Sequence, residues 1–223
     1  MALERKLTVE FIGTFFLVFT IGMAVATAGA LAPLAIGAVL MVMVFAGGHV
    51  SGAHYNPAVS TAVFVRGKMA QGEYVPYVAT QVVAAIAAAL VVTAIGYDPA
   101  HAVKVAGAGT MLVVEFLFTF ALAYVVLNVA TAEGTEGNSF YGLAIGFTVA
   151  SGAFAVGAVS GGAFNPAVAI GAMVLGLLSW SDIWVYLVAN IAGAIVAAYA
   201  FLFIQGAEKP EGDLRPAEVQ ETA

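Results

Sequence analysis

The chain has 223 residues, of which 62% are hydrophobic and only 9% are charged, and its net charge is −6. Soluble domains carry about 25% charged residues, so this composition excludes an ordinary soluble domain and predicts a protein that lies in the lipid bilayer. The acidic excess is concentrated in residues 208–221, and no basic patch that would bind nucleic acid is present. Cysteine is absent, which excludes disulfides, thiolate metal sites and catalytic thiols.

Three histidines, His49, His54 and His101, are spread along the chain and do not form a metal-binding set. We expect His101 to be solvated in an outer loop. The sequence therefore predicts no metal, no cofactor and no catalytic residues.

Apolar runs of two lengths alternate along the chain. A membrane-spanning helix needs about 20 apolar residues, and six runs are of this kind: 7–28, 33–49, 74–96, 109–130, 139–157 and 180–205. Two shorter runs, 57–66 and 166–176, would reach only halfway across at about 1.5 Å per residue. The predicted fold class is therefore an all-α membrane protein with six transmembrane helices and two re-entrant half-helices. Residues 206–223 are rich in Pro, Glu and Gly and are predicted to be a disordered cytoplasmic tail.

The two short runs begin with the same tripeptide, at Asn56-Pro57-Ala58 and Asn165-Pro166-Ala167, 109 residues apart. The same spacing relates four further pairs: Ile36-Gly37 with Ile145-Gly146, Ser51-Gly52 with Ser160-Gly161, Tyr77 with Tyr186, and Gln81 with Asn190. A spacing of 105 relates Glu10 to Glu115 in the first span of each half. We infer one channel domain, residues 1–205, made of repeat 1 (about 1–98) and repeat 2 (about 105–205). Three spans per half is an odd number, so the repeats are inverted in the membrane.

Each Asn-Pro pair predicts the start of a half-helix, because Asn is a good N-cap and Pro suits the first helical position. Irregular backbone at membrane depth is tolerated where it lines a water-filled cavity or is buried in protein. We therefore expect the preceding loops to present pore carbonyls, from Gly52, Ala53, His54, Tyr55, Gly161, Gly162, Ala163 and Phe164. Asn56 and Asn165 would be central donors next to two positive helix ends, which would orient a passing water and repel cations. A plainer alternative, compatible with this one, is that each Asn only caps its helix.

The basic residues predict the orientation of the chain. A cytoplasmic N-terminus places six of the seven Lys and Arg residues in the cytoplasm: Arg5, Lys6, Arg66, Lys68, Lys209 and Arg215. Only Lys104 would then lie outside. We expect a multi-pass protein of the plasma (inner) membrane with both termini cytoplasmic.

Residues 5–205 resemble the aquaporin, or major intrinsic protein, family. The resemblance rests on the paired Asn-Pro-Ala motifs, the Ser-Gly step before each, a Glu in the first and fourth spans, and Gln81 in the third. It implies a passive channel for water and small neutral solutes, with no enzyme activity, assembled as a homotetramer with one pore per subunit. It also implies that Glu10 and Glu115 hold the re-entrant loops, braced by Gln81 and by Asn190, where the family often has Pro. Ionisable groups inside spans leave a proton relay as the alternative.

In this family four positions near the outer mouth set selectivity. The resemblance places them at Ile36, Ala153, Gly162 and Val168. Water-selective members have an aromatic residue, His, a small residue and Arg there, whereas this chain has Val in place of Arg. The departure predicts a wider, less polar filter that passes glycerol, urea, hydrogen peroxide, ammonia or undissociated metalloid acids. The alternatives are a strictly water-selective aquaporin and, less favoured because the midplane offers two neutral amides, a secondary transporter.

Overall fold

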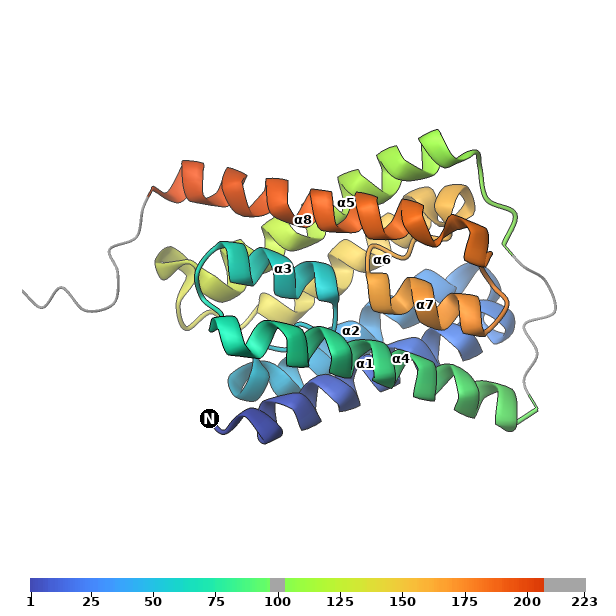
Figure 1. Ribbon diagram of the computed structural model, residues 1–223, viewed down its shortest axis with the longest axis horizontal. Helices are drawn as coiled ribbons and strands as arrows, with labels where there is room; N and C mark the ends of the chain where they lie inside the picture. The colour runs from blue at the N-terminus through green and yellow to red at the C-terminus, as the bar shows by residue number, and fades with distance from the viewer. Residues whose placement is uncertain (97–102, 207–223) are drawn as a thin grey trace, which may run out of the picture.

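The computed structural model describes residues 1–96 and 103–206, and the elements in this part of the chain are helices (Figure 1). His101 lies outside the described residues, and so does the predicted tail after Gly206. The eight α-helices are α1 (Leu3–Thr27), α2 (Ala32–Ser51), α3 (Pro57–Val65), α4 (Gln71–Ala94), α5 (Ala108–Thr131), α6 (Tyr141–Ser160), α7 (Pro166–Val174) and α8 (Ile183–Gln205). Single 3-10 turns occupy η1 (Gly29–Leu31), η2 (Glu133–Thr135) and η3 (Trp180–Asp182).

Six of these helices are long and apolar enough to cross a membrane, which confirms the predicted six spans. Their ends differ from the apolar runs by a few residues. α1 begins at Leu3 rather than residue 7, because charged residues extend the helix beyond its apolar part. α2 and α6 continue to the Ser of each Ser-Gly step and stop where Gly52 and Gly161 adopt left-handed φ values of 85° and 88°. Glycine ends a helix in this way without steric cost.

The two short helices, α3 and α7, have nine residues each and meet at their N-terminal ends in the middle of the bundle (Figure 1). Asn56 and Asn165 are the N-cap residues. Asn56 Oδ1 accepts a hydrogen bond from the Ala58 N–H at 2.8 Å, and Asn165 Oδ1 accepts one from the Ala167 N–H at 2.9 Å. The capped ends fix both half-helices with their positive ends facing one another.

α2 and α6 cross closely at a pair of glycines. A Cβ added to Gly146 would lie 2.4 Å from the Gly37 carbonyl oxygen, and one added to Gly37 would lie 2.6 Å from the Gly146 carbonyl oxygen. Small residues allow this approach between helices in a membrane. Ile36 and Ile145 precede these glycines, and both line the cavity described below.

α1 begins and α8 ends on the same side of the bundle (Figure 1). We call it the N-terminal side. The other side carries Val103, which follows the first half of the chain, and η3; we call it the opposite side.

Candidate functional site

A cavity of about 80 Å³ runs past the junction of α3 and α7, which is room for a short file of water molecules. Aliphatic side chains from four of the long helices, α1, α2, α5 and α6, line much of its wall. Both central asparagines line it, and so do the four residues of the expected filter, Ile36, Ala153, Gly162 and Val168. The structure therefore brings together residues that lie up to 132 positions apart in the sequence.

The loops before α3 and α7 have unusual backbone conformations. Ala53, Tyr55 and Phe164 adopt left-handed φ values of 50°, 49° and 48° without being glycine. Such residues cost of order 1–3 kcal/mol each and persist only where their surroundings hold them. The loops must therefore be held by contacts from outside.

Glu10 supplies these contacts to the first loop. Its Oε1 accepts hydrogen bonds from Ser51 Oγ at 2.7 Å and the His54 N–H at 2.9 Å. Its Oε2 accepts from the Tyr55 N–H at 2.7 Å and from Gln81 Nε2 at 2.8 Å. The carboxylate is fully buried, and its four donors tie α1, α2, α4 and the loop to one point.

Glu115 makes the matching set of contacts in the second half. Its Oε1 accepts hydrogen bonds from Ser160 Oγ at 2.6 Å and the Ala163 N–H at 3.0 Å. Its Oε2 accepts from the Phe164 N–H at 2.8 Å and from Asn190 Nδ2 at 2.9 Å. Glu115 is likewise fully buried. Each predicted scaffold residue thus lies against the loop of its own half.

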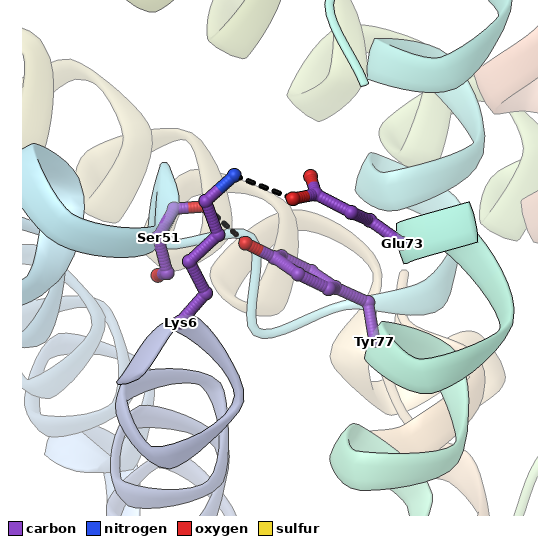
Figure 2. A network of polar contacts seen from close by, with 4 residues as sticks. All are labelled: Lys6, Ser51, Glu73 and Tyr77. Carbon is purple, nitrogen blue, oxygen red and sulfur yellow. Dashed lines mark hydrogen bonds and ion pairs between the residues drawn. The ribbon is translucent and has the colours of Figure 1, made fainter. Parts of the chain in front are cut away.

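A tyrosine anchors each loop at its start. The Tyr77 hydroxyl donates to the Ser51 carbonyl at 2.9 Å, one turn along α4 from an ion pair of 2.7 Å between Lys6 Nζ and Glu73 Oε1 (Figure 2). In the second half, the Tyr186 hydroxyl donates to the Ser160 carbonyl. Sequence reasoning matched these tyrosines through their spacing but gave them no role; the repeat was the signal that could have found them.

The two asparagines also join the halves. Asn56 Nδ2 donates to the Phe164 carbonyl, and Asn165 Nδ2 donates to the Tyr55 carbonyl, each at 2.9 Å. An amide has two N–H bonds, so one on each Asn is left for a molecule in the cavity.

Most of the residues that were expected to supply pore carbonyls lie at the cavity wall. Ala53, His54, Tyr55, Gly161, Gly162 and Ala163 line the cavity. Phe164 is not among its lining residues; its carbonyl accepts from Asn56 Nδ2, and its ring packs against Phe118, with centroids 5.3 Å apart. Gly52 lines a second, larger space.

This second space is a vestibule of about 750 Å³ that opens on the N-terminal side. Its wall includes charged and polar residues, among them Lys6, His49, Glu73 and Glu133. Within the described residues, no group of three or more His, Cys, Asp or Glu side chains could hold a metal ion.

Arg66 is a further buried residue that the sequence did not single out for a site. It caps the C-terminal end of α3, where Nε donates to Thr131 Oγ1 at 2.8 Å and a terminal nitrogen donates to the Thr131 carbonyl at 2.9 Å. Its guanidinium carbon lies 4.9 Å from the centre of the Phe201 ring. The residue that ends α3 therefore places its cation at the C-terminal end of α5.

Known proteins share this sequence and this architecture. Residues 1–201 match the Major intrinsic protein family. The chain is 38% identical over 219 residues to Aquaporin NIP1-3 of Oryza sativa subsp. japonica, covering 92% of this chain and 76% of that protein. It is 36% identical over 208 residues to Glycerol uptake facilitator protein-like 6 of Lactiplantibacillus plantarum, covering 87% of this chain and 95% of that protein.

Among solved structures, the X-ray structure of the aquaglyceroporin from Plasmodium falciparum superposes with a TM-score of 0.77. It is 21% identical and the match covers 90% of this chain and 96% of that one, so the likeness concerns the fold. Together with the six membrane-spanning helices, the family match over nearly the whole described chain shows that this protein belongs to the major intrinsic protein, or aquaporin, family of channels for water and small solutes, which are not enzymes.

Proposed function

We propose that this channel passes small neutral solutes larger than water, as well as water, through an apolar filter. The observation that carries the proposal is the cavity wall at Ile36, Ala153, Gly162 and Val168. None of the described residues that line this cavity is Lys or Arg. Without a bulky cation, the filter excludes fewer solutes by size. Backbone carbonyls then supply most of the hydrogen bonds that replace those between the solute and its water of hydration.

The solutes that suit such a wall have a polar edge for the loops and an apolar face for the aliphatic side chains. Glycerol, urea, hydrogen peroxide, ammonia and undissociated metalloid acids are the candidates. The names of two similar proteins, a glycerol uptake facilitator and an aquaglyceroporin, support this choice.

The free N–H of Asn56 and of Asn165 would orient each passing molecule at the centre of the pore. Both side chains are held by their bonds to the opposite half and are almost fully buried, with exposed fractions of 3%. A fixed donor pair beside two positive helix ends would break a chain of hydrogen-bonded water and repel cations. Glu10, Glu115, Gln81 and Asn190 act in this proposal as the scaffold that fixes the loops.

We assign the N-terminal side of the bundle to the cytoplasmic face of the plasma (inner) membrane. Arg5, Lys6, Arg66 and Lys68 support this orientation, because loops rich in Lys and Arg remain cytoplasmic. A homotetramer with one pore per subunit is proposed from the family alone. The protein would then be a single channel domain whose two repeats meet at the central asparagines.

The test is a side-by-side flux measurement on purified protein in liposomes. Val168→Arg introduces a cation with five donors at a site whose side chain is now 6% exposed. Hydrogen-bonded to nearby carbonyls, it should narrow the pore, so that the ratio of water to glycerol or urea permeability rises in stopped-flow light scattering.

The control is Val83→Ala on α4, because Val83 is 57% exposed on the outer face of the bundle and its change should leave the ratio unaltered. The proposal is wrong if the wild-type protein passes water but excludes every larger solute, as a strictly water-selective channel would. A need for an ion gradient would instead indicate a transporter.

A further inference from the structure

We propose that the size limit of this pore is set on its cytoplasmic side, by His54, Val126 and Ile145, and not at the four filter positions near the outer mouth. The inference deepens the proposed function and rests on it. It follows from where the internal spaces of the molecule meet and from the symmetry of the repeat.

The division between the two spaces lies on the N-terminal side. His54, Val126 and Ile145 line both the cavity and the vestibule, so the passage from one to the other runs between them. They come from three separate elements: the loop after α2, α5 and α6. Their exposed fractions are 9%, 5% and 5%, which shows that little open space surrounds them.

The outer filter does not divide the cavity in the same way. All four of its residues line a single space that continues past them to Val103 and Leu178 on the opposite side. Val103 is held there by a hydrogen bond of 2.9 Å from its N–H to the Leu177 carbonyl. A solute entering from outside would therefore reach the two asparagines before it reached the boundary between the cavity and the vestibule.

The repeat explains why a second constriction arises at this depth. By the spacing of 109 residues, Ile145 is the counterpart of Ile36, and His54 is the counterpart of Ala163. By the spacing of 105, Val126 is the counterpart of Ile21. The cytoplasmic group is thus related, by the pseudo-two-fold axis of the repeat, to residues that line the outer half of the pore.

The two groups related by the repeat differ in the size of their side chains. The cytoplasmic side has an imidazole where the outer side has the methyl group of Ala163. It also has Val44, which lines the vestibule, where the outer filter has Ala153. Only the exchange of Ile21 for Val126 goes the other way, by one methylene. The cytoplasmic group is therefore the bulkier of the two.

The side chains of this constriction are also held in place. His54 Nδ1 lies 3.1 Å from Ser60 Oγ, and its ring packs against Tyr77 with centroids 5.3 Å apart. Ile145 precedes Gly146, whose close contact with Gly37 fixes α6 against α2. A rigid constriction of one imidazole and two aliphatic side chains would limit solutes by size and by the water they must shed.

The experiment compares the same change at equivalent positions of the two repeats, Ile145→Ala and Ile36→Ala. Permeabilities to glycerol and to the longer polyol erythritol are measured in liposomes, with Val83→Ala as the variant on the outer face of the bundle. We expect Ile145→Ala to raise the erythritol-to-glycerol ratio severalfold, and Ile36→Ala to raise it by clearly less. An equal or larger gain for Ile36→Ala overturns the inference while the proposed function stands. A wild-type protein that passes neither polyol contradicts the proposed function itself.

A second measurement applies even if Ile145→Ala does not fold. The chain has no cysteine, so Val59→Cys, inside the cavity, would be its one thiol. Thiol reagents of increasing size are added to one face of oriented vesicles at a time. We expect larger reagents to react from the outer face than from the cytoplasmic face. The opposite order, or no difference between the two faces, overturns the inference.

Discussion

Glu10 and Glu115 each accept four hydrogen bonds in a fully buried position. Burial of a carboxylate costs several kcal/mol, and only a full set of donors offsets that cost. Two of the four donors to each carboxylate are backbone N–H groups of a strained loop, which have no partner within a helix. Each carboxylate therefore exchanges a desolvation cost for a fixed loop geometry, which favours a scaffold over a proton relay.

The first prediction is that Glu10→Gln destabilises the protein without changing which solutes pass. The amide has one oxygen in place of two and turns an NH₂ group toward donors such as the Tyr55 N–H. Each buried group left unsatisfied costs about 1–3 kcal/mol. Unfolding in detergent, followed by circular dichroism, measures the loss, with the exposed Glu4→Gln as control. A stable variant that had lost a pH-dependent flux would instead support the relay.

The bracing residues show what the sequence could and could not predict at this scale. Gln81 and Asn190 were expected to support the loops, and each donates to the Glu of its half. Their second contacts differ: Gln81 Nε2 reaches Ser60 Oγ at 3.0 Å, and Asn190 Nδ2 reaches Thr119 Oγ1 at 2.9 Å. Thr14, the counterpart of Thr119, has a buried Oγ1 with no hydrogen-bond partner among the described residues. The counterpart of Ser60 is Ala169, which has no hydroxyl, so Asn190 cannot make the bond that Gln81 makes and donates to Thr119 instead.

At the scale of elements, local signals fixed the half-helices more closely than the spans. The expected starts at residues 57 and 166 coincide with α3 and α7, because Asn-Pro is a specific start signal. The expected end of the fifth span, residue 157, falls short of Ser160. Apolar run length marks where a helix enters the polar region, whereas the left-handed φ of Gly161 marks where the backbone turns.

The second prediction concerns the crossing of α2 and α6. Gly146→Ala places a Cβ 2.4 Å from the Gly37 carbonyl oxygen, a backbone atom that cannot rotate away. The helices must separate, and overpacking of this kind costs about 1–3 kcal/mol. The same change at Gly157 on α6 meets nothing within 4 Å and should stabilise by about 0.5–1 kcal/mol. Thermal unfolding of the two variants should therefore shift in opposite directions, and equal shifts would show that the crossing can relax.

At the scale of the whole molecule, equivalent residues of the two repeats line the two halves of the pore. The half-helices carry Val at the same place, Val59 and Val168, and both line the cavity. The absence of Arg from the filter thus makes the two halves more alike. The sequence allowed the filter positions in this wall to be predicted through its resemblance to the family. It did not indicate which side is narrower, since that depends on how His54 is held by Ser60 and Tyr77.

The halves are nevertheless unequal in their charges, and the proposed orientation in the membrane rests on this difference. Lys6, Arg66 and Lys68 belong to the N-terminal side, whereas Lys104 lies on the opposite side. The counterpart of Arg66 is Leu175, the C-cap residue of α7, so the buried cation that joins α3 to α5 has no equivalent at this position in the other half. This bias supports the proposed orientation with the N-terminal side in the cytoplasm.

The last prediction tests that orientation with two glycines on exposed turns. Gly134 lies in η2 on the N-terminal side, Gly107 caps α5 on the opposite side, and a Cβ at either position meets nothing within 4 Å. Because the chain has no cysteine, Gly134→Cys and Gly107→Cys each carry a single thiol. A membrane-impermeant maleimide applied to intact cells should label Gly107→Cys, and should label Gly134→Cys only after permeabilisation. The reverse pattern would place the N-terminal side outside the cell, and the constriction at His54 and Ile145 would then face incoming solutes first.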